Sequence, residues 1–296
     1  MPERDGYIPG VPCWVDTSQP DPEAAVAFYG ALFGWDFENV TPPGSGGDYF
    51  IARIRAGDVA AVSPVTEGAP PVAMWNTYIW VQSADEAASK VIEAGGKALM
   101  EPFDVGDAGR MAAFADSVGA SFCVWQARSH KGARIVNEAD SLNFNGLHVH
   151  DVAAAKKFYH AVFGWRTITV ADGAEMWTMP GYGDHLERDN PGLRERMAAM
   201  GAPSGFEDVV ATIAPIPEDE PNVAAYWDVT FAVDDADELA DKAAELGGRV
   251  IVAPRDVPWA RMTVIADPQG ATLNATKFVP ENKDLASRGQ STVTAA

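Results

Sequence analysis

Residues 21–35 alternate apolar and polar positions in the pattern of an amphipathic helix. The apolar positions recur every three or four residues, the period of a helix that packs one face on a core; they are Ala25, Phe28, Tyr29 and Leu32. Asp21 stands at the expected N-cap, Pro22 at the first helical position, and Gly34 just past the last turn. These signals predict a helix that ends at the Phe-Gly-Trp segment.

The same pattern occurs a second time in the chain. FYGALFGW at residues 28–35 returns as FYHAVFGW at residues 158–165, again with an aspartate, Asp151, at the expected N-cap. The apolar stripe is repeated as well, as Ala155, Phe158, Tyr159 and Val162. Self-similarity over this distance indicates a duplicated folded unit, and we expect most of these aromatic rings to pack in its core.

The second half of each copy is also repeated. A strand, a helix ending in Gly-Gly and further strands follow one another in both copies, around loops that carry Arg-Met and Asp-x-x-Gly. Arg110 corresponds to Arg261, and Asp116 corresponds to Asp267. The chain therefore contains four βαβββ-like modules in two pairs.

This organisation predicts an α+β fold with two domains. We place domain 1 at residues 8–127, a polar linker at 128–141, domain 2 at 142–280, and a disordered tail at 281–296. Domain 2 carries an insert at about residues 181–222 that has no counterpart in domain 1. A short helix should begin there at Asn190 and Pro191 and end at Gly201. The insert, with His185 at its start, is either a lid over a cleft or a surface loop.

Composition narrows the range of functions. The chain has 296 residues, 47% of them apolar, and a formal net charge of −20. This acidity, with no run of lysine or arginine, argues against nucleic acid as a partner. We find no signal peptide and no apolar stretch long enough for a membrane span, so we expect a cytoplasmic protein without a membrane partner. The two cysteines, Cys13 and Cys123, are too few for a disulfide framework.

The repeated helix ending in FYGALFGW, the Gly-Gly turn and the segment DPQGA together resemble the vicinal oxygen chelate superfamily, which includes glyoxalases, bleomycin-resistance proteins and extradiol dioxygenases. The resemblance covers almost the whole chain, and the tandem layout is similar to that of two-domain glyoxalase-like proteins of actinobacteria. It implies two curved, half-barrel sheets, each made of two modules, with helices outside and a ligand cleft inside. Because one scaffold hosts many activities, the resemblance alone does not fix the function.

The resemblance also implies positions for a metal site. Metal-binding members carry His, Gln or Glu on the first strand of each module and on the last strand of each domain. The corresponding residues here are Trp14, Asn76 and Cys123 in domain 1, and Phe144, Asp228 and Asn274 in domain 2. A divalent metal needs about three converging imidazole, thiolate or carboxylate ligands, which neither set offers. We therefore expect no metal and no other cofactor.

Strand alternation suggests what lines the cleft of domain 1 instead, because every second side chain of a strand faces the same way. The residues expected to face this cleft are Trp14, Asp16, Asn76, Tyr78, Trp80, Cys123 and Trp125. Four aromatic rings beside short polar groups are suited to a flat aromatic ligand. The alternative is that these rings only fill the half-barrel or the contact between the two copies.

Domain 2 is more polar on the same face. Phe144 and His148 alternate along one strand, Tyr226 and Asp228 alternate along the next, and Asn274 lies on the last. A histidine within reach of an aspartate can move a proton near neutral pH, so His148 and Asp228 are candidate catalytic residues. His148 and His150 could instead hold a metal together with Asp228, or could be structural or exposed.

From the sequence we thus expect a metal-independent protein that binds a hydrophobic, aromatic metabolite or antibiotic. The alternative is an enzyme of the same fold, with lyase, isomerase or hydroxylase-type activity in domain 2. A structural homodimer without a ligand is a third possibility, although it would leave the aromatic cleft unexplained. We expect either a monomer with two stacked domains or a homodimer.

Overall fold

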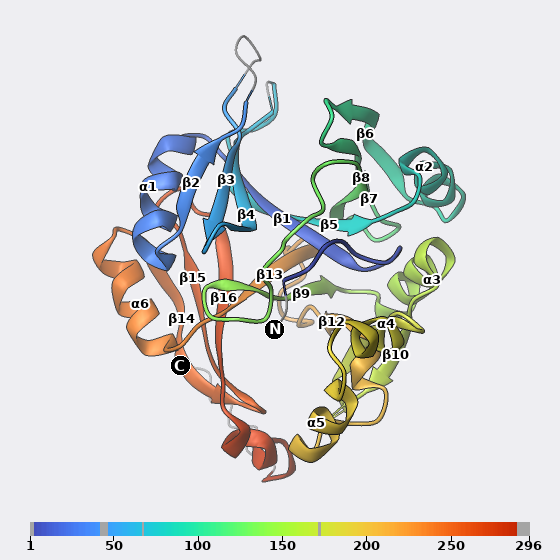
Figure 1. Ribbon diagram of the computed structural model, residues 1–296, viewed down its shortest axis with the longest axis vertical. Coiled ribbons are helices and arrows are strands. Elements are labelled where there is room, and N and C mark those ends of the chain that lie inside the picture. The colour runs from blue at the N-terminus through green and yellow to red at the C-terminus, as the bar shows by residue number, and fades with distance from the viewer. Residues whose placement is uncertain (1–2, 42–46, 67, 171–172, 289–296) are drawn as a thin grey trace.

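A computed structural model describes residues 3–41, 47–66, 68–170 and 173–288 of the chain (Figure 1). Two eight-stranded sheets have equivalent strand orders, β2-β3-β4-β1-β5-β8-β7-β6 and β10-β11-β12-β9-β13-β16-β15-β14. Each sheet contains the strands of one copy only. The predicted α+β fold with tandem half-barrels is therefore confirmed, and each concave face lies within one copy.

The first sheet and its helices occupy the N-terminal half of the chain. Their bounds are β1 Pro12–Gln19, α1 Pro22–Phe33, β2 Asp36–Asn39, β3 Phe50–Ile54, β4 Gly57–Pro64, β5 Met74–Trp80, α2 Ala84–Glu93, β6 Lys97–Val105, β7 Gly109–Ala115 and β8 Ser121–Ala127. The helix signals are confirmed in α1, since the Asp21 side chain accepts a hydrogen bond from the Ala24 amide and Gly34 is left-handed with φ of 70°.

The second sheet repeats this order. Its elements are β9 Ser141–Val149, α3 Val152–Phe163, β10 Arg166–Thr169, β11 Glu175–Thr178, β12 Val209–Pro215, β13 Tyr226–Ala232, α6 Ala236–Glu245, β14 Arg249–Val257, β15 Ala260–Ala266 and β16 Thr272–Phe278. Asp151 caps α3 as Asp21 caps α1. β9 is the first strand of one module and β13 is the first strand of the other. They are antiparallel neighbours at the centre of the sheet, as β1 and β5 are in domain 1.

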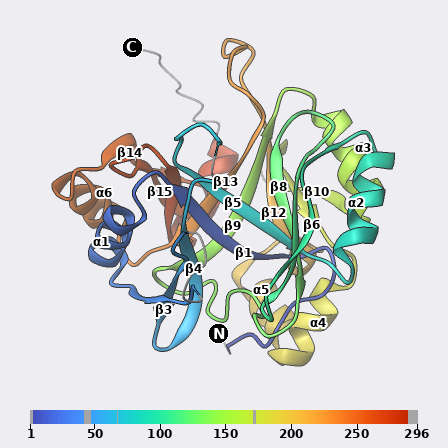
Figure 2. The same cartoon turned by 90° about the horizontal axis from the view of Figure 1, so that it is seen from above.

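The two sheets meet through their convex sides, and their concave faces point away from each other (Figure 1). At the centre of this contact, Thr77 on β5 donates a hydrogen bond to Asn145 on β9 over 2.9 Å, and both side chains are buried. Viewed from above, α1 and α6 cover one side of the strands, and α2 and α3 cover the opposite side (Figure 2). Each side of the molecule thus pairs one helix from each copy.

The repeated aromatic segment connects the two copies to each other. Tyr29 in α1 donates a hydrogen bond to Asp267 of domain 2 over 2.8 Å, and Tyr159 in α3 donates to Asp116 of domain 1 over 2.9 Å. All four side chains are buried. The second carboxylate oxygen of each aspartate accepts backbone amides of its own Asp-x-x-Gly turn. The repeat therefore has a structural role that requires both copies.

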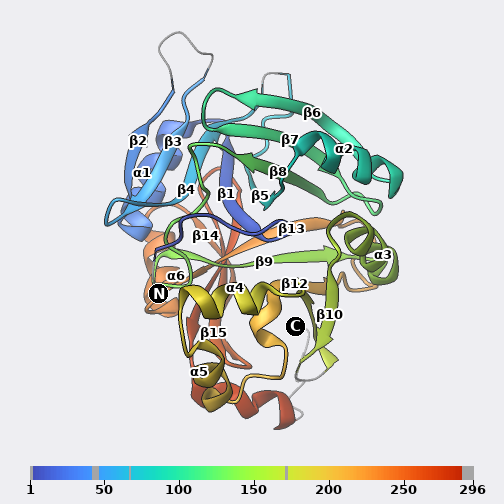
Figure 3. The same ribbon diagram turned by 45° about the vertical axis from the view of Figure 1, so that its right-hand side comes forward.

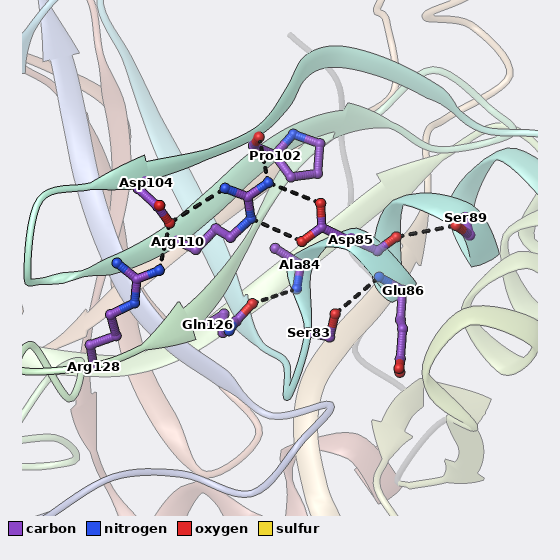
Figure 4. A network of polar contacts seen from close by, with 10 residues as sticks. All are labelled: Ser83, Ala84, Asp85, Glu86, Ser89, Pro102, Asp104, Arg110, Gln126 and Arg128. Atoms are coloured by element: carbon purple, nitrogen blue, oxygen red, sulfur yellow. Dashed lines mark hydrogen bonds and ion pairs between the residues drawn. The ribbon is translucent and has the colours of Figure 1, made fainter.

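The repeated arginines brace the edge of each sheet. Arg110 on β7 makes two hydrogen bonds of 2.9 Å to Asp85, at the start of α2, and a third to the Pro102 carbonyl (Figure 4). Asp104 receives a further contact from this arginine and a bond from Arg128 (Figure 4). In domain 2, Arg261 pairs with Asp237 and Asp256 in the same way. These arginines tie a helix to the outer strands and lie away from both concave faces.

The insert of domain 2 differs from its sequence prediction. It contains two helices, α4 Tyr182–Asp189 and α5 Leu193–Met200, followed by the short helix η2 Phe206–Asp208. The predicted end at Gly201 is confirmed by its left-handed backbone, but α5 begins after the expected start and α4 was not predicted. Figures 1 and 3 show α5 close to the last helical segment, η3 Pro280–Arg288, at the outer end of sheet 2. A Cβ on Gly201 would lie 3.7 Å from the ring of Trp259, at the turn between β14 and β15.

The expectation of a disordered tail is wrong for its first part. Residues 280–288 form η3, a 3₁₀ helix that packs against β14 and β15. The rest of that segment, 289–296, lies outside the described residues. In the part of the chain that the structure covers, no helix has the length and apolar character of a membrane span.

Candidate functional site

The concave face of domain 1 is built around a buried carboxylate. Asp16 on β1 is 2% exposed and accepts hydrogen bonds from the Tyr78 hydroxyl over 2.8 Å and the Tyr49 hydroxyl over 3.1 Å. Asn76, its cross-strand neighbour on β5, donates to the other oxygen over 2.8 Å. Burial raises the pKa of this carboxyl above its usual value of 3.8. The hydrogen bonds that it accepts lower the pKa, but burial has the larger effect.

The aromatic rings expected to line this cleft belong to the core of domain 1. Trp14, Tyr78 and Trp125 are 3%, 6% and 6% exposed, and the Trp14 indole donates to the Tyr49 hydroxyl over 3.0 Å. Trp80 is partly buried and packs on the N-terminal segment beside Tyr7. Cys123 is buried, and burial raises the pKa of its thiol. This arrangement corresponds to the alternative considered above, in which the rings fill the half-barrel.

The linker closes this face from outside. The His130 ring meets the ring of Trp14 edge-on at a centroid distance of 4.5 Å, and its carbonyl accepts a hydrogen bond from the Trp125 indole over 3.0 Å. Further along, the Ala133 amide donates to the Cys13 carbonyl over 2.8 Å. Sequence reasoning missed His130, because nothing in a polar linker signals that it folds back onto the sheet.

The concave face of domain 2 is organised around a hydrogen-bonded histidine–aspartate pair. His148 Nε2 on β9 lies 2.8 Å from Asp228 Oδ2 on β13, with 26% and 15% of the two side chains exposed. Asn274 Nδ2 donates to the same Asp228 oxygen over 2.8 Å. The Tyr226 ring stacks on the His148 imidazole, with centroids 4.6 Å apart and planes 4° apart. The structure thus brings together four residues that the sequence placed on one face.

This geometry sets what the pair can do with a proton. An ionised carboxylate only accepts hydrogen bonds, so we assign the imidazole hydrogen to Nε2. His148 Nδ1 then keeps its lone pair, and in the described part of the chain it has no hydrogen-bond partner. Asn274 and the stacked Tyr226 ring hold the carboxylate and the imidazole in place. A base oriented by a carboxylate is the minimum apparatus for general acid–base catalysis.

The other histidines lie outside this arrangement. His150 is exposed and bonds to the Val223 carbonyl over 2.8 Å, so it does not converge with His148 on a common ligand position. His185 on α4 faces Asp189 of the same helix at 3.4 Å.

The residues at the family's metal positions do not fit a divalent metal. In domain 2 they are Phe144, Asp228 and Asn274, a hydrocarbon ring, one carboxylate and one amide, and the amide already donates to the carboxylate. In domain 1 they are Trp14, Asn76 and a buried thiol. No group of three His, Cys, Asp or Glu side chains converges within the described ranges. Structural and catalytic sites for such metals need a denser set of charged or imidazole ligands.

Two cavities lie apart from both concave faces. One, of about 310 Å³, lies between α3 and β10. The other, of about 360 Å³, lies between α2 and α3. Neither includes His148 or Asp228, whose face is a partly exposed surface instead of an enclosed space. Side-chain chemistry and exposure therefore favour the concave face of sheet 2 as the candidate site.

Comparison with known proteins agrees with the fold and the repeat. The sequence profile of the Glyoxalase/Bleomycin resistance protein/Dioxygenase superfamily matches residues 14–124 and again 141–274. The protein named "Putative glyoxylase CFP32" of Mycobacterium tuberculosis is 38% identical over 286 residues, covering 95% of this chain and 100% of that protein. The "Anthracycline biosynthesis protein DauV" of Streptomyces sp. (strain C5) is 34% identical and covers 92% of this chain and 94% of that protein.

Solved structures of low sequence identity share the same fold. The Mn(II)-bound glyoxalase from Novosphingobium aromaticivorans aligns with a TM-score of 0.58 at 16% identity, over 91% of this chain and 83% of that one. The 2,3-dioxygenase LapB from Pseudomonas sp. KL28 aligns with a TM-score of 0.58 at 11% identity, over 92% and 93%. Two profile matches, in register with two equivalent sheets, show that this chain belongs to the Glyoxalase/Bleomycin resistance protein/Dioxygenase superfamily, with one family domain in each copy.

Proposed function

We propose that this protein binds a hydrophobic, aromatic small molecule without a metal, on the concave face of sheet 2. The observation that carries the proposal is the contrast in exposure between the two concave faces. Asp16 and the rings of domain 1 are buried, whereas Phe144, His148 and Asp228 of domain 2 remain partly exposed.

The chemistry of this face suits such a ligand. By strand alternation, Phe278 shares the face of Asn274 on β16, and 58% of its side chain is exposed. Tyr226, 41% exposed, adds a second ring surface beside His148. Ligand sites commonly combine apolar walls with a few fixed polar groups, here the Asp228 carboxylate and the His148 imidazole. Two relatives are named for anthracycline biosynthesis, and anthracyclines contain fused aromatic rings, which supports an aromatic ligand.

Calorimetric titration of a panel of flat aromatic compounds that includes an anthracycline tests the proposal. At least one should bind saturably, and Phe144→Ala should weaken its affinity by about tenfold or more, the loss expected for one buried ring. Phe103→Ala is the matched control, because Phe103 is 39% exposed on β6 of domain 1. Weaker binding with Phe103→Ala and unchanged binding with Phe144→Ala would overturn the proposed location.

A second candidate function, catalysis in domain 2, is favoured by the 2.8 Å contact between His148 and Asp228. In an isomerase or lyase, His148 Nδ1 would take a proton from the ligand while Asp228 stabilises the imidazolium. His148→Ala should then reduce turnover by roughly 10²–10⁴-fold and leave affinity nearly unchanged. Mass spectrometry of ligands incubated with the protein distinguishes the two functions, because a binding protein returns every ligand unchanged.

A further inference from the structure

Gly146 on β9 lies between two oxygen atoms of neighbouring strands. It pairs with Asp228 on β13 and with Thr212 on β12. A Cβ at this glycine would lie 2.4 Å from Asp228 Oδ1 and 2.7 Å from Thr212 Oγ1, closer than real side chains allow. The two oxygens therefore lie close to the glycine, one from each neighbouring strand, and we call the space between them the Gly146 notch.

Domain 1 fills the equivalent space with its own side chain. The position that corresponds to Gly146 is Asp16, and its cross-strand neighbour is Asn76 in place of Asp228. The Asp16 carboxylate occupies that space and accepts a hydrogen bond from Asn76 over 2.8 Å. In domain 2 the carboxylate belongs to Asp228 on β13, and Gly146 on β9 has no side chain to face it.

Both oxygens at the notch keep free hydrogen-bonding capacity. Asp228 Oδ2 takes both the His148 and the Asn274 contacts. Asp228 Oδ1 and Thr212 Oγ1 have no hydrogen-bond partner among residues 3–41, 47–66, 68–170 and 173–288. With only 15% of its side chain exposed, Asp228 has limited access to water, so a ligand group that pairs with Oδ1 gains a hydrogen bond to a charged acceptor.

We propose that the Gly146 notch binds a hydroxyl group of the ligand. The hydroxyl donates its hydrogen to Asp228 Oδ1 and accepts the hydrogen of the Thr212 hydroxyl, and so uses both oxygens. An ammonium group could donate to both oxygens but would leave the Thr212 hydroxyl hydrogen without an acceptor, and a carboxylate would be repelled by Asp228. This inference rests on the proposed function, and it narrows the ligand to a hydroxylated aromatic compound.

Competition between 2-naphthol and 2-methoxynaphthalene tests the inference, because the methoxy compound has a similar ring but no hydrogen to donate. The wild-type protein should bind 2-naphthol about tenfold or more tightly, the effect of one hydrogen bond to a charged group. Asp228→Ala and Gly146→Ala should each bring the two affinities to within about twofold, since the first removes the acceptor of the ligand hydrogen and the second fills the notch. Thr212→Val should weaken both compounds and keep the preference, because both ligand oxygens can accept the Thr212 hydrogen. Thr169→Val on β10, an exposed threonine on the other face of sheet 2, is the control and should leave both affinities unchanged.

The outcomes separate this inference from the proposed function. Equal binding of both compounds by the wild type overturns the notch and leaves the aromatic site intact. A preference that persists in Asp228→Ala and in a folded Gly146→Ala variant also overturns it. If neither compound binds, the proposed function and the notch fail together. Thermal unfolding establishes which variants are folded.

Discussion

The two concave faces of this molecule have the same strand order and opposite contents. In domain 1, Asp16 and its hydrogen-bond partners fill the centre, and the linker at His130 packs over the rings. In domain 2, the centre holds a glycine beside the hydrogen-bonded pair of His148 and Asp228, which remains partly exposed. The difference shows that the half-barrel itself does not create a binding site. A few residues on the central strands decide whether its inner face is core or surface.

The largest effect should come from emptying the centre of domain 1. Asp16→Ala should lower the free energy of unfolding by about 3 kcal/mol, because buried donors such as the Tyr78 hydroxyl lose their acceptor and a cavity remains. Denaturant titration measures this loss. Asp228→Ala, a matched change in the partly exposed centre of domain 2, should cost clearly less. Equal losses in the two variants would contradict the contrast between the faces.

A smaller effect should distinguish core rings from site rings. Trp80→Ala should reduce stability by about 2 kcal/mol, because the ring packs on the N-terminal segment, and should leave the affinity for aromatic ligands unchanged. Phe144→Ala should instead weaken the affinity for aromatic ligands and leave the stability unchanged. Melting temperature and calorimetric affinity, measured on both variants, provide the check. Loss of binding in Trp80→Ala with stability intact would move the site to domain 1.

The pH dependence of stability should include a contribution from Asp16. Burial raises the pKa of this carboxyl in the folded chain above its usual value of 3.8, so the folded chain binds this proton more tightly than the unfolded chain does. Its contribution to stability is thus greatest at low pH and is lost as pH rises from about 3.8 through the raised pKa. The unfolding free energy of the wild type minus that of Asp16→Asn, measured from acid to neutral pH, should decrease as the pH rises through this range. A difference that rises with pH would be incompatible with this burial.

The last prediction is that removing metal ions has no effect. Since the residues at the family's metal positions are poor ligands in both domains, chelation with EDTA should change neither melting temperature nor ligand affinity. Elemental analysis of the purified protein complements this measurement. If the protein contains one transition metal per chain and ligand affinity depends on that metal, the proposed metal independence is wrong and the catalytic function is favoured.

Much of the fold could be predicted from local signals. The helix caps at Asp21 and Asp151 and the glycine ends depend on neighbouring residues only, and the repeat made each prediction twice. The helix α4 was missed because it begins after Gly181 without a side-chain cap, so the sequence carries no start signal there. Predictable features were those that short stretches of chain determine.

The candidate site was predictable only in part. Strand alternation correctly grouped His148, Tyr226, Asp228 and Asn274, because side-chain period and cross-strand neighbours follow from β geometry. It could not show that the face of domain 1 is filled, because that depends on Tyr49 and His130, which arrive from segments without periodicity. Which side of a strand a residue occupies is a local property, whereas access to solvent depends on distant segments.

The reciprocal contacts of Tyr29 with Asp267 and of Tyr159 with Asp116 bear on how the two faces came to differ. Such an exchange is the arrangement of an isologous interface, in which one surface meets an identical copy of itself. Between separate identical chains, a substitution that filled one cleft would fill both. Covalent fusion keeps the interface at a high effective concentration and removes the requirement for identity. One copy is then free to become scaffold while the other retains an accessible face.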